Sequence, residues 1–337
     1  MGAENSRKIK LLKLWELLKR ETDEKHPMDT YTIIDNLAKE GINVDRKILY
    51  ADIDVLNEFG YEIERNRGKR NSYYVPEHSF NSPEVRLLMD VVQGACFVTE
   101  KKTEELLTKI AALAGSKMGE MLKKNIVKFS TVKSTNERIY YSIDKIVDAI
   151  EEKKKISFYY FDYDVKRQMV FRKEKNDPCV DKRYIVNPVA TVFDNDQYYL
   201  ICYDDKHKGL TNYRVDRMDR VEVLDENITK NTEVSNIDIS SHKRQQFNMY
   251  SGKVEKVSFY ADKKLIDVIF DKFGSNIKLS ETSDGRLKCL CEVQVSPMFV
   301  AWCCSFGNRI KVEQPQKVVN MVKEHLKETL KQYEEDI

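Results

Sequence analysis

The spacing of apolar residues changes near residue 136, and this change constrains the fold more than any single motif. Before it, apolar residues recur every three or four positions, as on one face of an α-helix. After it, short apolar runs rich in Val, Ile, Tyr and Phe are separated by turn residues, which is typical of strands. The 337 residues also exceed the usual size of one compact domain. The sequence therefore predicts an α+β protein of several domains.

Residues 1–78 predict three helices followed by a hairpin. The predicted helices cover residues 9–20, 31–40 and 46–59, and the predicted strands cover residues 61–65 and 72–75. Thr30 and Asp45 stand where the N-caps of the second and third helices are expected. The tip of the hairpin, residues 66–71, is basic. Three helices and a basic hairpin form the pattern of a winged helix-turn-helix, which binds DNA through its third helix.

The candidate DNA contacts lie at the start of the third helix and in the hairpin. They are Arg46, Lys47, Tyr50, Arg65, Arg67, Lys69 and Arg70. Residues 1–78 carry 14 Lys and Arg against 15 Asp and Glu, so these residues would act as a local cluster within a domain that is not basic overall. The alternative interpretation is a solvated helix face and a charged loop tip. Four basic residues at the hairpin favour a DNA-binding wing.

The middle of the chain predicts a helical segment and then a small β-domain. Residues 79–135 are expected to be helical, to link the domains and to provide a dimer contact. Residues 136–228 predict one helix at 143–152, followed by short strands. These strands cover residues 156–163, 168–171, 183–193, 198–203, 210–215 and 221–224. A helix followed by short strands that close on themselves predicts an Sm-like or SH3-like β-barrel.

The remaining residues predict a linker and a second α+β domain. Residues 229–250 are polar, and we expect a linker with some helix. Residues 251–337 form the last predicted domain. Its strands are expected at 254–260, 277–281, 287–295 and 310–313, and its helices at 263–273, at 297–306 and from 315 onward. This βαββαβα order is that of a ferredoxin-like fold with one added helix.

Residues 198–217 carry the candidate ligand site. Tyrosine rings stack on bases and guanidinium groups bind phosphate, so this stretch suits a nucleotide or another phosphate-bearing ligand. The candidate contacts are Arg183, Tyr184, Tyr198, Tyr199, Tyr213, Arg214 and Arg217. Two alternatives stay open. One of Tyr198 and Tyr199 packs in the core, because successive strand residues face opposite sides, and Asp216 forms a structural ion pair with one of the arginines.

The same stretch resembles the signature of the WYL-domain family, whose members are mostly bacterial ligand-sensing transcription regulators. The resemblance lies in Asn187-Pro188, in Tyr198-Tyr199-Leu200 and in residues 213–218, which read Tyr-Arg-Val-Asp-Arg-Met. Tyr198 replaces the tryptophan of the family name. Residues 44–53 are similar to the recognition helix of DeoR-like regulators. Ile48 and Ala51 depart from that pattern, in which a small polar residue and an arginine are common.

The resemblance covers nearly the whole chain. It implies an N-terminal winged helix-turn-helix, a WYL domain and a C-terminal WCX-type extension. We therefore expect a homodimeric, cytoplasmic transcription regulator that binds DNA, and we expect a repressor rather than an activator. Its binding to operator DNA is expected to respond to a nucleotide or a single-stranded nucleic acid at the WYL domain. The alternative function is an accessory protein that binds single-stranded RNA or DNA and modulates a partner.

Sequence motifs for other functions are absent. The chain contains no HExxH, GxSxG, Walker A or GxGxxG motif, so we expect no enzymatic activity and no cofactor. It contains neither an uninterrupted apolar run of about 18 residues nor the pattern of a secretory signal, so we expect no membrane partner. The cysteines that lie closest in sequence are Cys289, Cys291, Cys303 and Cys304. Their spacing is unusual for zinc, and we expect buried, reduced thiols, with a metal site as the alternative.

Overall fold

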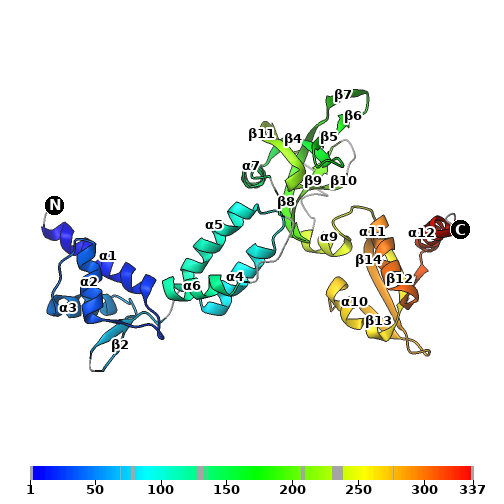
Figure 1. Ribbon diagram of the computed structural model, residues 1–337. Coiled ribbons are helices and arrows are strands. Elements are labelled where there is room, and N and C mark those ends of the chain that lie inside the picture. The colour runs from blue at the N-terminus through cyan, green and yellow to red at the C-terminus, as the bar shows by residue number, and fades with distance from the viewer. Residues whose placement is uncertain are drawn as a thin grey trace. The chain divides into compact units, whose positions relative to one another are not determined.

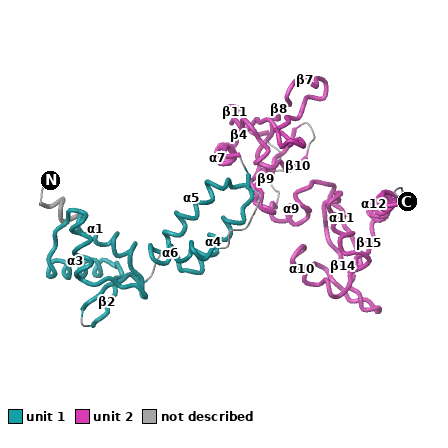
Figure 2. The backbone as a smooth tube through the Cα atoms, viewed as in Figure 1, with its two compact units in different colours: residues 1–135 teal, residues 136–337 magenta. Residues whose placement is uncertain are grey.

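The computed structural model divides the chain into two compact units, residues 1–135 and 136–337 (Figure 2). It describes residues 3–68, 70–76, 80–126, 133–134, 136–205, 209–229, 238–275 and 277–334. Several helices and several antiparallel sheets are present (Figure 1). The expectation of a mixed α+β protein is therefore confirmed.

Unit 1 begins with three helices and a small sheet. The helices are α1 (Ala3–Glu21), α2 (Thr30–Lys39) and α3 (Arg46–Glu58), and the strands are β1 (Met28–Asp29), β2 (Glu64–Asn66) and β3 (Ser72–Tyr74). The sheet order is β1-β3-β2. Leucines and isoleucines at helical spacing fill the core between the helices, among them Leu14, Ile33, Leu37, Leu49 and Ile53. A basic hairpin thus follows three packed helices.

The N-caps of the second and third helices are both aspartates. Asp45 accepts a hydrogen bond from the backbone N–H of Ile48 at 2.9 Å, as expected. Asp29, and not Thr30, caps α2, because its carboxylate accepts from the N–H groups of both Tyr31 and Thr32. The prediction of Thr30 as the cap is wrong by one residue. Thr30 is instead the first helical residue, and its hydroxyl donates to the carbonyl of Asn71.

The rest of unit 1 is helical. It contains α4 (Ser82–Gly94), α5 (Glu100–Ala111) and α6 (Ser116–Lys124). Asn81 and Glu84 form a capping box at the start of α4. Gly119 allows α6 to approach α5 closely, since a Cβ atom there would come within 2.5 Å of the carbonyl oxygen of Ala111. Val85, Met89 and Leu122 are buried between these helices, so the segment has an apolar core of its own.

Unit 2 begins with α7 (Ile139–Glu151) and an antiparallel sheet. The strands are β4 (Lys154–Tyr163), β5 (Met169–Phe171), β8 (Arg183–Asp194), β9 (Gln197–Asp204), β10 (Gly209–Arg214) and β11 (Met218–Asn227). Their order is β10-β9-β8-β4-β11, with β5 beside β4. A short hairpin of β6 (Lys173–Glu174) and β7 (Asp177–Asp181) was not predicted.

The strand pairs of this sheet form an open path among the described strands, whereas the sequence predicted a closed barrel. The reason lies in the turn at Val215–Arg217, a single 3-10 turn between β10 and β11. Immediately after it, Met218 pairs with Tyr160 of β4, so β11 lies at the opposite edge of the sheet from β10. The consecutive strands β10 and β11 thus form the two edges of the sheet, and no strand pairing among the described residues joins these edges.

The C-terminal part of unit 2 contains a second antiparallel sheet with the order β13-β14-β12-β15. Its elements are α9 (Ile239–Gln245), β12 (Lys253–Ala261), α10 (Ile266–Phe273), β13 (Lys278–Glu281), β14 (Leu287–Val295), α11 (Pro297–Ser305), β15 (Ile310–Gln314) and α12 (Gln316–Glu334). The crossovers through α10 and α11 each pass over one strand, as in a split βαβ arrangement. Phe259, Phe299 and Val312 belong to its core. Within the described parts of the chain, no helix is long and apolar enough to cross a membrane.

Candidate functional site

The first candidate site is a basic surface on the N-terminal helices and hairpin. Arg46, in the first turn of α3, places its guanidinium carbon 4.2 Å from the centre of the Tyr31 ring. Arg70 of the hairpin lies 5.5 Å from the same ring. Tyr31 is 51% exposed, so one ring near the solvent holds two cations by cation–π attraction. The sequence singled out both arginines but not Tyr31.

A second tyrosine supports the other side of this surface. Arg65 of β2 lies 5.9 Å from the ring of Tyr50 on α3. The ring of Tyr50 also contacts Tyr73, with 6.1 Å between the ring centres. Its hydroxyl lies 3.5 Å from that of Thr30. Tyr50 is therefore fixed between α2, α3 and the hairpin, and it positions Arg65.

The cations of this surface are exposed and have no carboxylate partners in the described chain. Arg46, Lys47, Arg65, Arg67 and Arg70 are all exposed. None of them forms an ion pair with a carboxylate of the described residues. Lys69, the remaining candidate, lies outside the described residues. We call Tyr31, Arg46, Lys47, Tyr50, Arg65, Arg67 and Arg70 the N-terminal basic surface.

The second candidate site was expected on β8, β9 and β10, and two of its tyrosines are in the core. Tyr184 is 9% exposed and stacks on Phe158, with ring centres 5.4 Å apart. Tyr213 is 8% exposed and meets the edges of Phe158, Tyr160 and Tyr184 at 5.1 to 5.3 Å. Burial raises the pKa of Tyr213 well above its usual range. These rings form an aromatic cluster of Phe158, Tyr160, Tyr184 and Tyr213, so Tyr184 and Tyr213 do not present free faces to a ligand.

Arg214 lies at the end of β10 and is already bound to a carboxylate. Its Nε and Nη2 atoms donate to the two oxygens of Asp216 at 3.0 and 2.8 Å, which is a bidentate ion pair. The backbone N–H of Arg214 donates to the hydroxyl of Tyr160 at 3.3 Å. Across the sheet, Arg214 pairs with the half-buried Tyr199 of β9, and burial raises the pKa of Tyr199. The structure therefore brings Tyr199 and Arg214 together.

Arg217 belongs to a second ion-pair group on the same side of β4. Its Nη1 donates to Asp162 at 3.3 Å, and Arg172 donates to the same carboxylate at 2.9 and 3.4 Å. The bond from Arg172 holds the pKa of Asp162 below its usual range. Arg172 also lies 4.7 Å from the ring of Tyr160. The Nε atom of Arg217 is buried and has no hydrogen-bond partner among the described residues, so one guanidinium donor stays unused.

Sequence reasoning missed Asp162 and Arg172, because they are separated from Arg217 by 55 and 45 positions and no local pattern marks them. We call Asp162, Arg172, Tyr199, Arg214, Asp216 and Arg217 the arginine–aspartate surface. It contains three guanidinium groups and two carboxylates. An anionic ligand could bind there only by sharing these arginines with the aspartates or by displacing them.

The remaining candidate residues lie apart from this surface. Arg183 donates to Ser157 and to Glu222, both at 2.8 Å. Ser157 and Tyr160 differ by an odd number of positions on β4, so Arg183 lies over the opposite face from Tyr160. Tyr198 packs against Phe193, with 5.3 Å between the ring centres, and is half-buried.

The four cysteines that lie closest in sequence are wholly or partly shielded from solvent. Cys289 and Cys303 are buried, and Cys291 and Cys304 are partly buried. Burial raises the pKa of Cys289 to about 11 and that of Cys291 to about 12, which keeps both thiols neutral. The described residues contain no group of three or more His, Cys, Asp or Glu side chains placed to hold a metal.

Comparison with known proteins identifies one domain of the chain. Residues 142–223 match the family model of the WYL domain. The predicted resemblance is therefore confirmed for this part, which contains the whole arginine–aspartate surface. No curated protein matches the chain.

Among solved structures, the chain is similar to Proteasome accessory factor B/C (PafBC) of Arthrobacter aurescens, with 16% sequence identity and a TM-score of 0.28. That match covers 94% of this chain and 46% of the other. The chain thus spans about half the length of that protein.

Proposed function

We propose that the chain is a DNA-binding transcription regulator, and more specifically a repressor, whose operator binding is controlled at its WYL domain. The controlling ligand is a nucleotide or a single-stranded nucleic acid. The DNA-binding domain is a winged helix-turn-helix in residues 1–78, and residues 79–135 join two copies of the chain into a homodimer. The protein acts in the cytoplasm, by binding and without catalysis.

One observation carries this proposal, namely that the cations of the N-terminal basic surface are exposed and lack described carboxylate partners. In a domain with 14 basic and 15 acidic residues, ion pairs would be expected to absorb most of the arginines. Here Arg46, Arg65 and Arg70 instead rest on tyrosine rings, which hold them in place while leaving their donors free for phosphate. Phosphate contacts of this kind position a helix on duplex DNA.

The WYL domain supports the sensing part of the proposal. Three arginines lie around two aspartates, and Tyr199 stands beside Arg214. A phosphate that takes Arg214 from Asp216 would move the turn at Val215–Arg217, which connects β10 to β11. Allosteric coupling between two sites is typically about 1–3 kcal/mol, or about 5- to 150-fold in affinity.

The DNA-binding part is tested by titrating the full chain with labelled duplex DNA from its own promoter at low salt. We expect saturable binding that weakens steeply with salt, because phosphate contacts release counterions. Arg67→Ala combined with Arg70→Ala should weaken binding. A chain that ignores this duplex, and whose double variant behaves like the parent, is not a DNA-binding regulator of this kind.

The sensing part is tested on the same complex with single-stranded oligonucleotides and nucleotides as competitors. An effector should change operator affinity in the parent and not in the Arg214→Ala variant. If single strands bind at the WYL domain while duplex DNA never binds, the alternative function of an accessory single-strand-binding protein is correct.

A further inference from the structure

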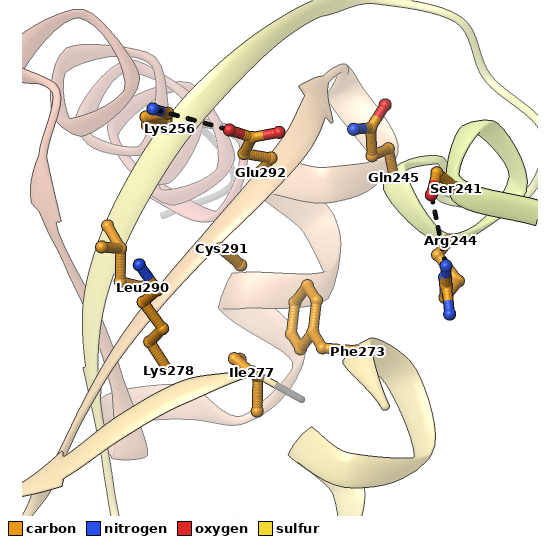
Figure 3. Close-up of a pocket in the computed structure, with 10 residues that line it drawn as sticks. All are labelled: Ser241, Arg244, Gln245, Lys256, Phe273, Ile277, Lys278, Leu290, Cys291 and Glu292. Carbon is orange, nitrogen blue, oxygen red and sulfur yellow. Dashed lines mark hydrogen bonds and ion pairs between the residues drawn. The ribbon is translucent and has the colours of Figure 1, made fainter. Parts of the chain in front are cut away.

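A groove of about 390 Å³ lies in the C-terminal part of unit 2, outside both surfaces described above. The residues lining it belong to α9, β12, the end of α10, β13 and β14, with Ile277 immediately before β13 (Figure 3). They are Ser241, Arg244, Gln245, Lys256, Phe273, Ile277, Lys278, Leu290, Cys291 and Glu292. A volume of this size falls within the range of small-molecule sites.

The floor of the groove is apolar. Phe273 and Ile277 lie on one side of β14, and the side chain of Cys291 points toward them (Figure 3). The thiol of Cys291 is neutral, because burial raises its pKa to about 12. Leu290 adds apolar surface on the other side of the strand. A flat apolar body would therefore lose its hydration on contact with this floor.

The rim of the groove is cationic. Among the described lining residues, Arg244, Lys256 and Lys278 oppose a single carboxylate, Glu292. Glu292 lies 3.7 Å from Lys256. Arg244 donates to the hydroxyl of Ser241 at 3.2 Å, and that hydroxyl donates to the carboxylate of Asp238. Lys278 has no ion-pair partner within the part of the chain that the structure describes. The net positive charge favours a ligand with an acidic group.

The groove is too short for an added peptide strand. β13 pairs with β14 only as far as Lys278 opposite Leu290. Further along β14, the side chain of Gln294 is bound to that of Gln246 at 3.1 Å. Between these two points only Cys291, Glu292 and Val293 have an edge without a described strand beside it. An edge of three residues offers too few backbone groups for strand addition, so a small molecule is the better occupant.

We propose that this groove is a second ligand site, which binds a small amphipathic anion: a flat apolar body with a carboxylate, sulfonate or phosphate group. The apolar body rests on Phe273, Ile277 and Cys291. The acidic group lies at the cationic rim, to which α9 contributes Arg244 and β13 contributes Lys278, opposite Leu290. This site is distinct from the arginine–aspartate surface and does not depend on the function proposed for it.

The test is a fluorescence titration of the full chain with 8-anilinonaphthalene-1-sulfonate, an anion with an apolar aromatic body. We expect one saturable site for each chain. Arg244→Glu combined with Lys278→Glu should weaken binding about tenfold, since each reversed charge at an exposed rim changes affinity severalfold. Both residues are exposed, so the variant should unfold at the same temperature as the parent. N-phenyl-1-naphthylamine, the neutral counterpart of the probe, should bind more weakly than the anion.

The matched control is Lys323→Glu combined with Lys327→Glu on the exposed side of α12, which changes the net charge by the same amount. Its affinity should stay within about twofold of the parent. If the groove variant and the control bind the probe equally well, or if the neutral probe binds as tightly as the anion, the proposed site is wrong. If the groove variant is less stable than the parent, Arg244→Gln combined with Lys278→Gln replaces it. Its affinity for the anionic probe should fall about threefold. An unchanged affinity would contradict the proposal.

Discussion

The N-terminal basic surface and the arginine–aspartate surface both consist of arginines and tyrosines, but the arginines have different partners. On the N-terminal basic surface, Arg46, Arg65 and Arg70 rest on tyrosine rings and have no described carboxylate partners. On the arginine–aspartate surface, Arg214 is bound to Asp216, while Arg172 and Arg217 share Asp162. The first arrangement leaves every donor available to phosphate. The second requires that a ligand either share the arginines with a carboxylate already in place or displace that carboxylate.

This difference indicates two kinds of binding. A surface of unpaired cations binds phosphate strongly and with a steep dependence on salt. A surface of paired cations binds more weakly, but a ligand that does bind must rearrange the ion pairs. Such a rearrangement is a physical change that a domain can transmit.

The largest effect is expected from the core beneath the arginine–aspartate surface. Phe158 is fully buried and contacts Tyr160, Tyr184 and Tyr213. Phe158→Ala should lower the free energy of unfolding by about 3–5 kcal/mol. Urea unfolding of the full chain measures this loss in the free energy of unfolding. Tyr31→Ala, which removes the exposed ring of the N-terminal basic surface, should change stability by less than about 0.5 kcal/mol. Equal losses of stability in Phe158→Ala and Tyr31→Ala would contradict the assignment of Phe158 to the core and Tyr31 to the surface.

The next effect concerns the charge of the N-terminal basic surface. Arg46→Ala, Arg65→Ala and Arg70→Ala together should lower duplex affinity about a hundredfold at moderate salt. Affinity falls as salt rises, and the steepness of log affinity against log salt should decrease by about 3, one for each lost phosphate contact. Fluorescence anisotropy over a salt series measures both. Lys101→Ala, Lys109→Ala and Lys124→Ala, on the helices of residues 79–135, form the matched control, and a slope that falls equally in that control would contradict specific contacts.

A smaller and opposite effect is expected on the arginine–aspartate surface. Asp162→Asn frees Arg172 and Arg217, so affinity for a labelled single-stranded oligonucleotide should rise about fivefold. Asp225→Asn, which breaks the exposed pair with Lys154, should leave it unchanged. Unchanged affinity in Asp162→Asn would show that the ligand does not use these arginines.

The same aspartate gives a pH dependence with a defined sign. Arg172 lowers the pKa of Asp162 in the folded chain. Its stabilising ion pairs are therefore complete above the ordinary carboxyl pKa and are lost as the pH falls through the lowered one. The stability difference between the parent and Asp162→Asn should thus be constant near neutral pH and vanish in strong acid. Urea unfolding over a pH series checks this, and a difference that persists in acid would rule out the ion pairs as its cause.

The smallest effect separates the ring of Tyr31 from the charges it holds. Tyr31→Ala should weaken duplex binding about threefold, because each exposed cation–π contact contributes about 0.5–1 kcal/mol. The salt slope should not change, since the cations remain. Tyr31→Phe keeps an aromatic face and should bind like the parent. If Tyr31→Phe loses as much as Tyr31→Ala, the hydroxyl and not the ring is what the surface needs.

Much of the secondary structure followed from local signals in the sequence. Asp45 and the glycines after α2 and α3 mark helix ends through groups only a few positions away, so the limits of α3 were predicted within one residue. The two-residue strands β1 and β6 were missed because they are too short to show alternation. The open sheet path was missed because it depends on where Met218 finds its partner, and that partner is 58 positions earlier, at Tyr160.

The sequence by itself determined where the cations are: an arginine-rich hairpin at residues 65–70 and two arginines three positions apart, Arg214 and Arg217, in the part that matches the WYL domain. Only the tertiary structure decided what each cation contacts. Sheet pairing brings Asp162 to Arg217 and turns Tyr184 and Tyr213 into the core, while the packing of α2 against α3 brings Tyr31 to Arg46. The physical reason is range. Caps and turns act over a few residues, whereas ion pairs and ring contacts depend on which distant strands and helices come together.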